Sequence, residues 1–417
     1  MKKRKVTTVI LLFIGIAQVC FTGCSGYKDY LLRRSEELHD EEEDSETDQP
    51  ADTSGGGTSL PADPYGTGIV DVKKQLYSYD DMTADIKELC EAYGDRLSYE
   101  IAGKSIDNRD IYLLHLGNEK AKKRIFVDAA IHGREYISSQ LVMKMVEYYA
   151  SRYDDNDYRG VSYRDLLDRV CFDIIPMVNP DGVSISQYGE EGLRDKELVK
   201  LLKECYERDK EYLVYLDDGI GFMYWADNYK KEDFDRNELS EEFKTYISYE
   251  EYLTQWKSNA VGVDINDNFD VEWEDANYKD YPSYGMSKGE RPESEPESEM
   301  LIRESGKHDY LCFLNYHCRG QLIYYDSYGM NEEQLRASYG LAEELQLLTG
   351  YLPFSTAQHD SDKAGFGEYI HIILNKPGVT VEVGKAPSPV PISEFAGIFE
   401  KNRECFAMLA YKYGYGR

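Results

Sequence analysis

The stretch RIFVDAAIHGREYISSQ, residues 124–140, joins an apolar run to a histidine and a glutamate, and then to a helical pattern. The run RIFVDAAI is almost continuously apolar, which is typical of a strand buried on both faces of a sheet. The helix SSQLVMKMVEYYASRY follows it, with Ser138 or Ser139 near its start. A buried strand that leads into a helix predicts one unit of an α/β sheet.

The same alternation runs through the rest of the chain. Helical spacing appears in residues 77–94 and 392–414. The expected strands are LSYEIAGKS (97–105), DIYLLHLG (110–117), CFDIIPMV (171–178), YLCFLNYH (310–317), LIYYD (322–326) and VTVEV (379–383). Strands interleaved with helices predict an α/β fold: a single domain with a mixed, mostly parallel twisted sheet that helices cover on both faces.

Residues 1–23 have the three parts of a secretory signal peptide: a basic cluster, an apolar stretch and small residues. The segment FTGC resembles a bacterial lipobox, although Phe21 stands where an aliphatic residue is usual. We therefore expect an extracytoplasmic lipoprotein that is held on a membrane by a lipid on Cys24. Plain secretion and an uncleaved anchor remain open, and both also place the rest of the chain outside the membrane.

Three further segments are expected. Residues 24–65 contain the acidic run ELHDEEEDSETD and the flexible run TSGGGTSLPADP, so we expect a disordered linker. Residues 66–417 form the expected catalytic domain. Within it, an insertion at about 195–260 is too long for a plain loop and is expected to carry its own helices. It is interpreted either as a lid over the cleft or as a peripheral addition.

Composition excludes some functions. The formal net charge of the chain is −30, and this argues against nucleic acid or anionic lipid headgroups as partners of the bulk surface. Apolar residues make up 41%, which is enough for a sizeable core. Six cysteines lie beyond Cys24 without a close CxxC pair, and several stand in apolar runs typical of buried free thiols.

Polar residues with metal-binding chemistry lie at the ends of the apolar strands. His132 and Glu135 follow the first strand, His317 closes another, and Glu382 ends the last. The carboxyl ends of parallel strands meet at one edge of a sheet, so we expect these side chains to meet there. Three such ligands and a water make an open catalytic zinc site, and a further carboxylate can accept the proton of that water.

Each residue also has a plainer interpretation. A lone histidine at a strand end is usually a satisfied polar residue, and Glu382 alone is more often a buried ion-pair partner. A second His-x-x-Glu pair, His39 and Glu42, lies in an acidic run where no site is plausible. The joint placement at strand ends is what favours the metal site.

Five motifs occur in an order that resembles the zinc carboxypeptidase family, the carboxypeptidase A-like metallopeptidases. They are HGRE, NPDG, GVDINDNFD, NYHCRGQLIYY and VTVEVG, and the resemblance runs from about Tyr77 to the C-terminus. It implies a peptide hydrolase that binds one Zn²⁺ per chain.

The resemblance also implies roles for single residues. His132, Glu135 and His317 match the zinc ligands, and Glu382 matches the glutamate that activates the zinc-bound water. Arg194, fifteen residues after the asparagine of NPDG, matches the arginine that polarises the scissile carbonyl.

The substrate-binding positions match the family only in part. Arg134 matches a substrate-contacting arginine, and Asn266 matches an asparagine that helps to hold the substrate terminus. Asp267 stands where the family usually has the arginine that grips a C-terminal carboxylate. An aspartate there repels a carboxylate and favours a cation. The family's capping tyrosine is missing near Gln358 and His359.

These departures leave several functions open. One is a metallocarboxypeptidase with altered C-terminal specificity, acting on amidated ends or on the diamino acid of cell-wall peptides as an endopeptidase or amidase. A second is an ordinary carboxypeptidase in which Arg134 or another basic residue takes over the carboxylate. A third is a lipoprotein that binds peptides without cleaving them.

Overall fold

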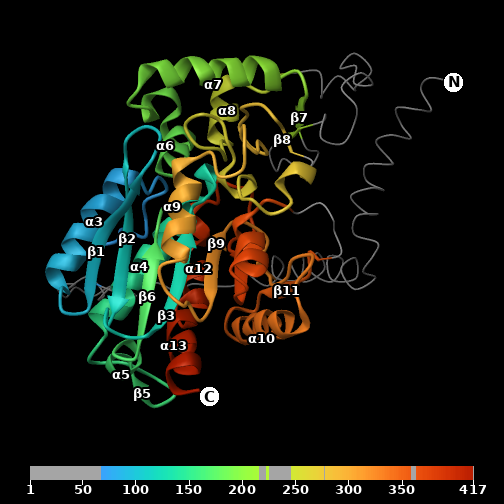
Figure 1. Cartoon of the computed structure of the whole chain (residues 1–417). Coiled ribbons are helices and arrows are strands. Elements are labelled where there is room, and N and C mark those ends of the chain that lie inside the picture. Colours follow the sequence, from blue (N-terminus) through green and yellow to red (C-terminus); the bar gives the residue numbers. More distant parts are fainter. Residues whose placement is uncertain (1–66, 216–221, 225–245, 277, 358–362, 417) are drawn as a thin grey trace, which may run out of the picture. The chain divides into compact units, whose positions relative to one another are not determined.

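A computed structural model describes residues 67–215, 222–224, 246–276, 278–357 and 363–416 (Figure 1). Residues 63–234 and 246–417 form one compact unit, to which all described residues belong. The expected signal peptide, the linker with Cys24, and the pair Gln358 and His359 lie outside the described residues.

Eight strands form one mixed sheet in the order β1-β2-β6-β3-β9-β12-β10-β11. The strands β6, β3, β9 and β12 run parallel at its centre, and β10 and β11 form a further parallel pair. The pairs β1–β2, β2–β6 and β10–β12 are antiparallel. The strands span β1 Leu97–Lys104, β2 Asp110–Gly117, β3 Lys123–Ala129, β6 Val170–Ile175, β9 Phe313–His317, β10 Leu322–Tyr324, β11 Leu352–Phe354 and β12 Gly378–Glu382.

Helices cover both faces of this sheet because its central strands are apolar on both sides. In β3, Ile125 and Val127 pack into one hydrophobic cluster while Phe126 packs into another. This alternation follows from the two-residue period of a strand. The helices are α3 Tyr79–Ala92, α4 Tyr136–Ser151, α5 Tyr163–Leu167, α6 Pro180–Tyr188, α7 Lys196–Asp209, α8 Tyr249–Thr254, α9 Pro296–Ser305, α10 Glu332–Thr349, α11 Phe366–Glu368, α12 Phe395–Asn402 and α13 Cys405–Tyr415.

The predicted fold class is confirmed: an α/β domain with a mixed sheet between helices. One expected element differs, because the helix expected over 392–414 is split into α12 and α13. At the break, the Asn402 side chain donates to the carbonyl of Ile398 at 2.8 Å. Such local bonds compete with the backbone bonds that would continue a helix.

The expected insertion carries its own helices, as predicted. It contains α7, the short hairpin of β7 (Leu213–Tyr215) and β8 (Phe222–Tyr224), and α8. A separate hydrophobic cluster joins α7 and α8 to Ile185 of α6 and to Trp256, which is fully buried. The described part of the insertion therefore packs against the rest of the domain through α6 and through Trp256, which follows α8.

Two further features concern the described residues alone. None of their helices is long and apolar enough to cross a membrane. The six cysteines among them are free thiols, and five of these are buried. The prediction that several cysteines are buried free thiols is confirmed.

Candidate metal centre and catalytic site

The carboxyl ends of three neighbouring strands bring the predicted residues together. Glu382 of β12 is the register partner of His317 of β9. On the other side of β9, Tyr316 is the register partner of Ala129, the last residue of β3. His132 follows β3 by three residues, so the parallel register places all of these groups at one edge of the sheet.

His132, Glu135 and His317 form a compact cluster of buried donors. Each offers one ligand atom, and the three atoms lie within 4.8 Å of one another. The two imidazole rings are 5.0 Å apart and nearly perpendicular. Glu135 Oε2 accepts a hydrogen bond from the backbone N–H of Cys318 at 2.9 Å and lies 3.5 Å from His317 Nδ1. Two imidazoles and one carboxylate are the donor set of an open zinc site.

A further carboxylate supports this donor set. Asp264 Oδ1 lies 3.1 Å from His132 Nδ1. A carboxylate against one ring nitrogen orients the imidazole and leaves the other nitrogen for a metal. Asp264 is fully buried, and the neighbouring charges of Lys257 and His132 hold the pKa of its carboxyl well below the usual range despite burial. The residues present therefore fit a zinc ion.

The loop that carries His132 is held by backbone contacts that explain two of the motifs. A Cβ on Gly133 would lie 2.4 Å from the carbonyl carbon of Gly182, so only glycine allows the HGRE and NPDG segments to touch. Asn179 Nδ2 lies 3.1 Å from each of three carbonyl oxygens, those of Ile131, Lys257 and Ser258. One amide thus ties the metal-ligand loop to the segment after α8.

Glu382 has the environment of a proton-transfer group. Its Oε2 is buried and has no hydrogen-bond partner among the described residues. Burial raises the pKa of this carboxyl well above the usual range, and the charge of Glu135 adds to the rise. The cations that oppose the rise are Lys257, Arg134 and Arg319.

Arg194 is not among these cations, and the structure corrects the expectation that it polarises the scissile carbonyl. Its exposed guanidinium donates to the carbonyl of Asn108 at 2.8 Å and lies over the ring of Tyr79. Its backbone N–H donates to Asp107. Counting fifteen residues from Asn179 fails here because the chain enters the insertion immediately after Arg194.

Lys257, unlike Arg194, is a cation close to the predicted metal centre. Its Nζ lies 3.4 Å from Asp264 Oδ2, and its charge acts on Glu382 and His317. Sequence reasoning missed Lys257 because it comes after the insertion, at a distance from NPDG that no spacing rule predicts. The available signal was the motif WKSNAVGVD, in which Lys257 stands seven residues before Asp264.

Comparison with known proteins agrees with this centre. The family model described as zinc carboxypeptidase matches residues 82–351, well over half of the chain. The chain belongs to the zinc carboxypeptidase family. The matched region includes the three ligands and ends before Glu382, which the register with His317 places beside them.

Two bacterial proteins resemble this zinc carboxypeptidase family member over most of its length. Gamma-D-glutamyl-L-diamino acid endopeptidase 1 of Lysinibacillus sphaericus is 27% identical over 334 residues, which are 79% of this chain and 70% of the relative. The uncharacterized protein YqgT of Bacillus subtilis is also 27% identical, over 78% of this chain and 75% of its own.

Among solved structures, thrombin-activatable fibrinolysis inhibitor matches with a TM-score of 0.58 at 18% identity, over 82% of this chain and 75% of that chain. Carboxypeptidase A from Helicoverpa armigera matches with a TM-score of 0.53 at 16% identity, over 82% and 74%. These structures share the fold.

The three predicted substrate-binding residues of this zinc carboxypeptidase family member have different surroundings. Arg134 Nη1 donates to Gln255 Oε1 at 3.0 Å, and its charge reaches Glu382. Asn266 Oδ1 accepts from the backbone N–H of Phe366 at 3.1 Å. Asp267 is buried, and its Oδ2 has no hydrogen-bond partner in the described part of the chain. A buried carboxylate oxygen is thus found at the position where the resemblance implied an arginine.

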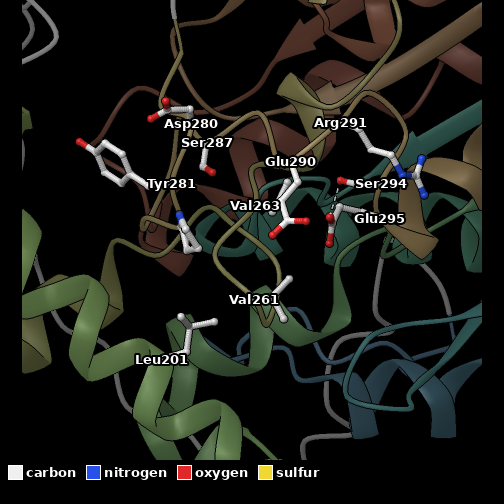
Figure 2. A pocket seen from close by; sticks show the side chains of 12 residues that line it. Leu201, Val261, Val263, Asp280, Tyr281, Ser287, Glu290, Arg291, Ser294 and Glu295 are labelled. Atoms are coloured by element: carbon white, nitrogen blue, oxygen red, sulfur yellow. Dashed lines mark hydrogen bonds between the residues drawn. The ribbon is translucent and has the colours of Figure 1, made fainter.

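A pocket of about 420 Å³ lies beside this region and contains none of the predicted site residues (Figure 2). Leu201 of α7 and the segment from Asp280 to Glu295 line it, and Glu290 and Glu295 contribute carboxylates to its wall. Its Ser287 carbonyl accepts from the backbone N–H of Asp264 at 2.9 Å. The backbone of one residue that lines the pocket is thus hydrogen-bonded to the residue whose carboxylate lies against His132 Nδ1.

Proposed function

We propose that the protein is an extracytoplasmic, zinc-dependent peptide hydrolase that acts on peptides bearing a diamino acid, such as cell-wall peptides. The observation that carries the proposal is a buried cluster of two imidazoles and one carboxylate together with a buried aspartate, Asp267, at the position where the resemblance implies a carboxylate-binding arginine. The name of the Lysinibacillus sphaericus relative, a gamma-D-glutamyl-L-diamino acid endopeptidase, supports the substrate class.

The geometry supports separate roles in metal binding and in proton transfer for the residues of the site. His132, Glu135 and His317 would hold the zinc ion, which when bound lowers the pKa of a water molecule and polarises a carbonyl. The raised pKa of Glu382 suits this carboxylate to accept the proton of that water and to deliver it to the leaving nitrogen.

Lys257 and Arg134 supply positive charge on the same side. The negative charge that develops on the scissile carbonyl oxygen is stabilised by cations that are already in place. Lys257 is held by its contact with Asp264 and by the bond from the Gly133 N–H to its carbonyl. It therefore needs little reorganisation during the reaction.

Substrate choice tests the proposal. The full chain, loaded with zinc, is assayed on peptides that differ only at the end: a free hydrophobic residue, its amide, and a residue with a side-chain amine. We expect the amine-bearing and amidated peptides to be cleaved and the free hydrophobic carboxylate to be disfavoured. A strong preference for free hydrophobic carboxylates would show an ordinary carboxypeptidase.

Catalysis itself has a separate control. The variant Glu382→Gln is expected to lower kcat by about 10²–10⁴-fold while it keeps the zinc. If the wild-type chain holds one zinc yet cleaves none of the peptides, the alternative of a peptide-binding lipoprotein replaces the hydrolase.

Membrane attachment through a lipid on Cys24 is part of the proposal and follows from the signal-like N-terminus. It is tested by fractionating cells that express wild type or Cys24→Ala. Wild type is expected with the membranes and the variant in the soluble extracytoplasmic fraction. Equal distribution of the two proteins would contradict lipidation.

A further inference from the structure

The pocket in Figure 2 has an acidic part and an apolar part, and one buried amide holds the two together. Asn259 is fully buried, and its Nδ2 donates to Glu295 Oε2 at 2.6 Å. Oδ1 of the same side chain accepts from the backbone N–H groups of Val261 and Val263, each at 3.1 Å. Val261, Val263 and Glu295 all line the pocket. One side chain therefore fixes the apolar wall relative to a carboxylate.

A second amide holds the loop that carries Glu290, another residue of the pocket wall. Asn268 Nδ2 donates to the carbonyl of Lys288 at 2.9 Å and to Ser294 Oγ at 2.9 Å. Gly289 lies in this loop at φ of +80°, and a Cβ there would lie 2.8 Å from Asn268 Nδ2. These contacts fix the loop, and the pocket is therefore preformed, as sites for small molecules usually are.

The charge of the lining side chains is mainly negative. Asp280, Glu290 and Glu295 contribute carboxylates, and Arg291 is the one basic residue among those that line the pocket. Nη1 of Arg291 already donates to two backbone carbonyls of its own loop, at 3.1 Å and 3.0 Å. Figure 2 shows this guanidinium directed away from Glu290. The excess of negative charge suits a cationic ligand.

A buried hydroxyl indicates the kind of cation. Ser287 is 1% exposed, and its Oγ has no hydrogen-bond partner within the described part of the chain. Figure 2 shows this hydroxyl on the side of Ser287 that faces Leu201 and Val261, which also line the pocket. A buried polar group without a partner is unfavourable. Because the neighbouring carboxylates disfavour an anion, the fitting partner is a positively charged N–H donor.

We propose that this pocket binds a small organic cation, with its ammonium group at the carboxylates and its alkyl part against Leu201 and Val261. The ammonium N–H groups would donate to Ser287 Oγ and to the carboxylates of Glu290 and Glu295. A calcium ion fits less well, because it requires many oxygen ligands and part of this wall is aliphatic. The volume of about 420 Å³ is usual for a small-molecule site.

Binding of n-butylammonium to the full, zinc-loaded chain tests this site without any substrate, so the result is independent of the proposed function. A ligand-observed NMR titration at neutral pH measures Kd, and 1-butanol is the matched neutral ligand. We expect saturable binding of the amine with a Kd of about 1 mM. The alcohol should bind at least about tenfold more weakly, because it has no charge to place against the carboxylates.

Two substitutions alter the pocket in different ways. Glu290→Gln removes an exposed carboxylate and should weaken binding of the amine by about tenfold. Val261→Arg introduces a guanidinium into the pocket and should abolish measurable binding, because the protein then supplies its own cation. Glu343→Gln and Leu347→Arg, at exposed positions of α10, are the matched controls and should bind the amine as wild type does.

Several results would overturn the site. One is the absence of saturable binding, and another is equal affinity for the amine and the alcohol. Unchanged affinity in Glu290→Gln is a third, and this variant keeps the test decisive even if Val261→Arg does not fold. Loss of binding in Asp267→Asn, with retention in Glu290→Gln, would place the amine at the metal centre instead. Tighter binding of Ca²⁺ than of the amine, measured by displacement, would identify a metal-ion site.

Discussion

Lys257 lies against Asp264, with 3.4 Å between the lysine Nζ and the aspartate Oδ2, and the other oxygen of the same carboxylate lies 3.1 Å from His132 Nδ1. The cation proposed to face the developing oxyanion and the imidazole proposed to bind zinc thus share one orienting group. A change at Lys257 should therefore affect the reaction more than it affects folding.

The first prediction separates Lys257 from Arg194. Lys257→Met should lower kcat by about 10²–10³-fold, because one preformed charge at the oxyanion is lost. Lys257→Arg should recover part of this loss, and Arg194→Ala should stay close to wild type. Steady-state kinetics with a zinc assay on each variant checks the prediction. A large loss in Arg194→Ala beside an active Lys257→Met would restore the role that spacing assigned to Arg194.

Metal content gives the second prediction. Wild type should bind one zinc per chain, and His132→Gln and His317→Gln should each bind much less. His115→Gln is the matched control. His115, Cys171 and Asp173 also cluster, but Arg124 Nε already donates to Asp173 at 2.6 Å and Tyr310 donates to it at 2.8 Å. Metal analysis after dialysis checks both sites. If His115→Gln lost zinc while His132→Gln and His317→Gln kept it, the metal centre would instead be the cluster of His115, Cys171 and Asp173 on β2 and β6.

The third prediction concerns Glu297, a buried residue of α9. Burial, with added repulsion from Asp181, raises its pKa from an ordinary 4.5 to about 8. A carboxyl whose pKa is raised by folding stabilises the protein fully below the ordinary pKa, and this contribution is lost as pH rises through the folded value. The free energy of unfolding of wild type should therefore fall between about pH 5 and pH 9.

Glu297→Gln is neutral at every pH and should show a smaller fall. Chemical unfolding at several pH values measures the difference, and Glu299→Gln on the exposed face of the same helix is the control. Identical pH profiles for wild type and Glu297→Gln would show that Glu297 is already ionised in the folded protein.

The fourth prediction concerns the beginning of the folded domain. The fully buried carboxylate of Glu147 accepts hydrogen bonds from the backbone N–H groups of Thr67, Gly68, Ile69 and Val70, and from Lys144 Nζ at 2.8 Å. Removing the carboxylate takes this acceptor from four backbone donors and removes the negative charge that lies against the buried lysine. Glu147→Ala should therefore lower the free energy of unfolding by about 3 kcal/mol or more.

Truncation gives an independent check of the same anchor. A chain that starts at Thr67 should unfold with nearly the wild-type free energy, whereas a chain that starts at residue 71 should resemble Glu147→Ala. Glu343→Ala controls for loss of an exposed carboxylate. Equal stability of the two truncated chains would show that the anchor contributes little.

The sequence predicted the sheet and the ligands because both follow from local patterns. Apolar runs mark β3, β9 and β12, and a parallel register brings the residues at their carboxyl ends together. The position of Lys257 follows from no such pattern. It depends on how α7 and α8 pack and on the bond from Asn179 to its carbonyl, which are long-range contacts.

The close approach of Glu368 to Asn266 could not be predicted for a related reason. The Glu368 carboxylate reaches Asn266 only because Gly365 leaves room, and such close approach between segments a hundred residues apart has no signature in a single chain. Asp267, by contrast, departed visibly from a known motif and could be singled out from the sequence alone.

The Asn179 amide has a consequence for how this chain can diverge. Its Nδ2 lies 3.1 Å from the carbonyl oxygen of Ile131, which precedes the ligand His132, and 3.1 Å from that of Lys257, which follows the inserted segment. The segment between Arg194 and Trp256 therefore always ends at the residue whose carbonyl accepts from Asn179. That stretch can lengthen, shorten or be exchanged over generations while the spatial relation between imidazole and lysine stays constant.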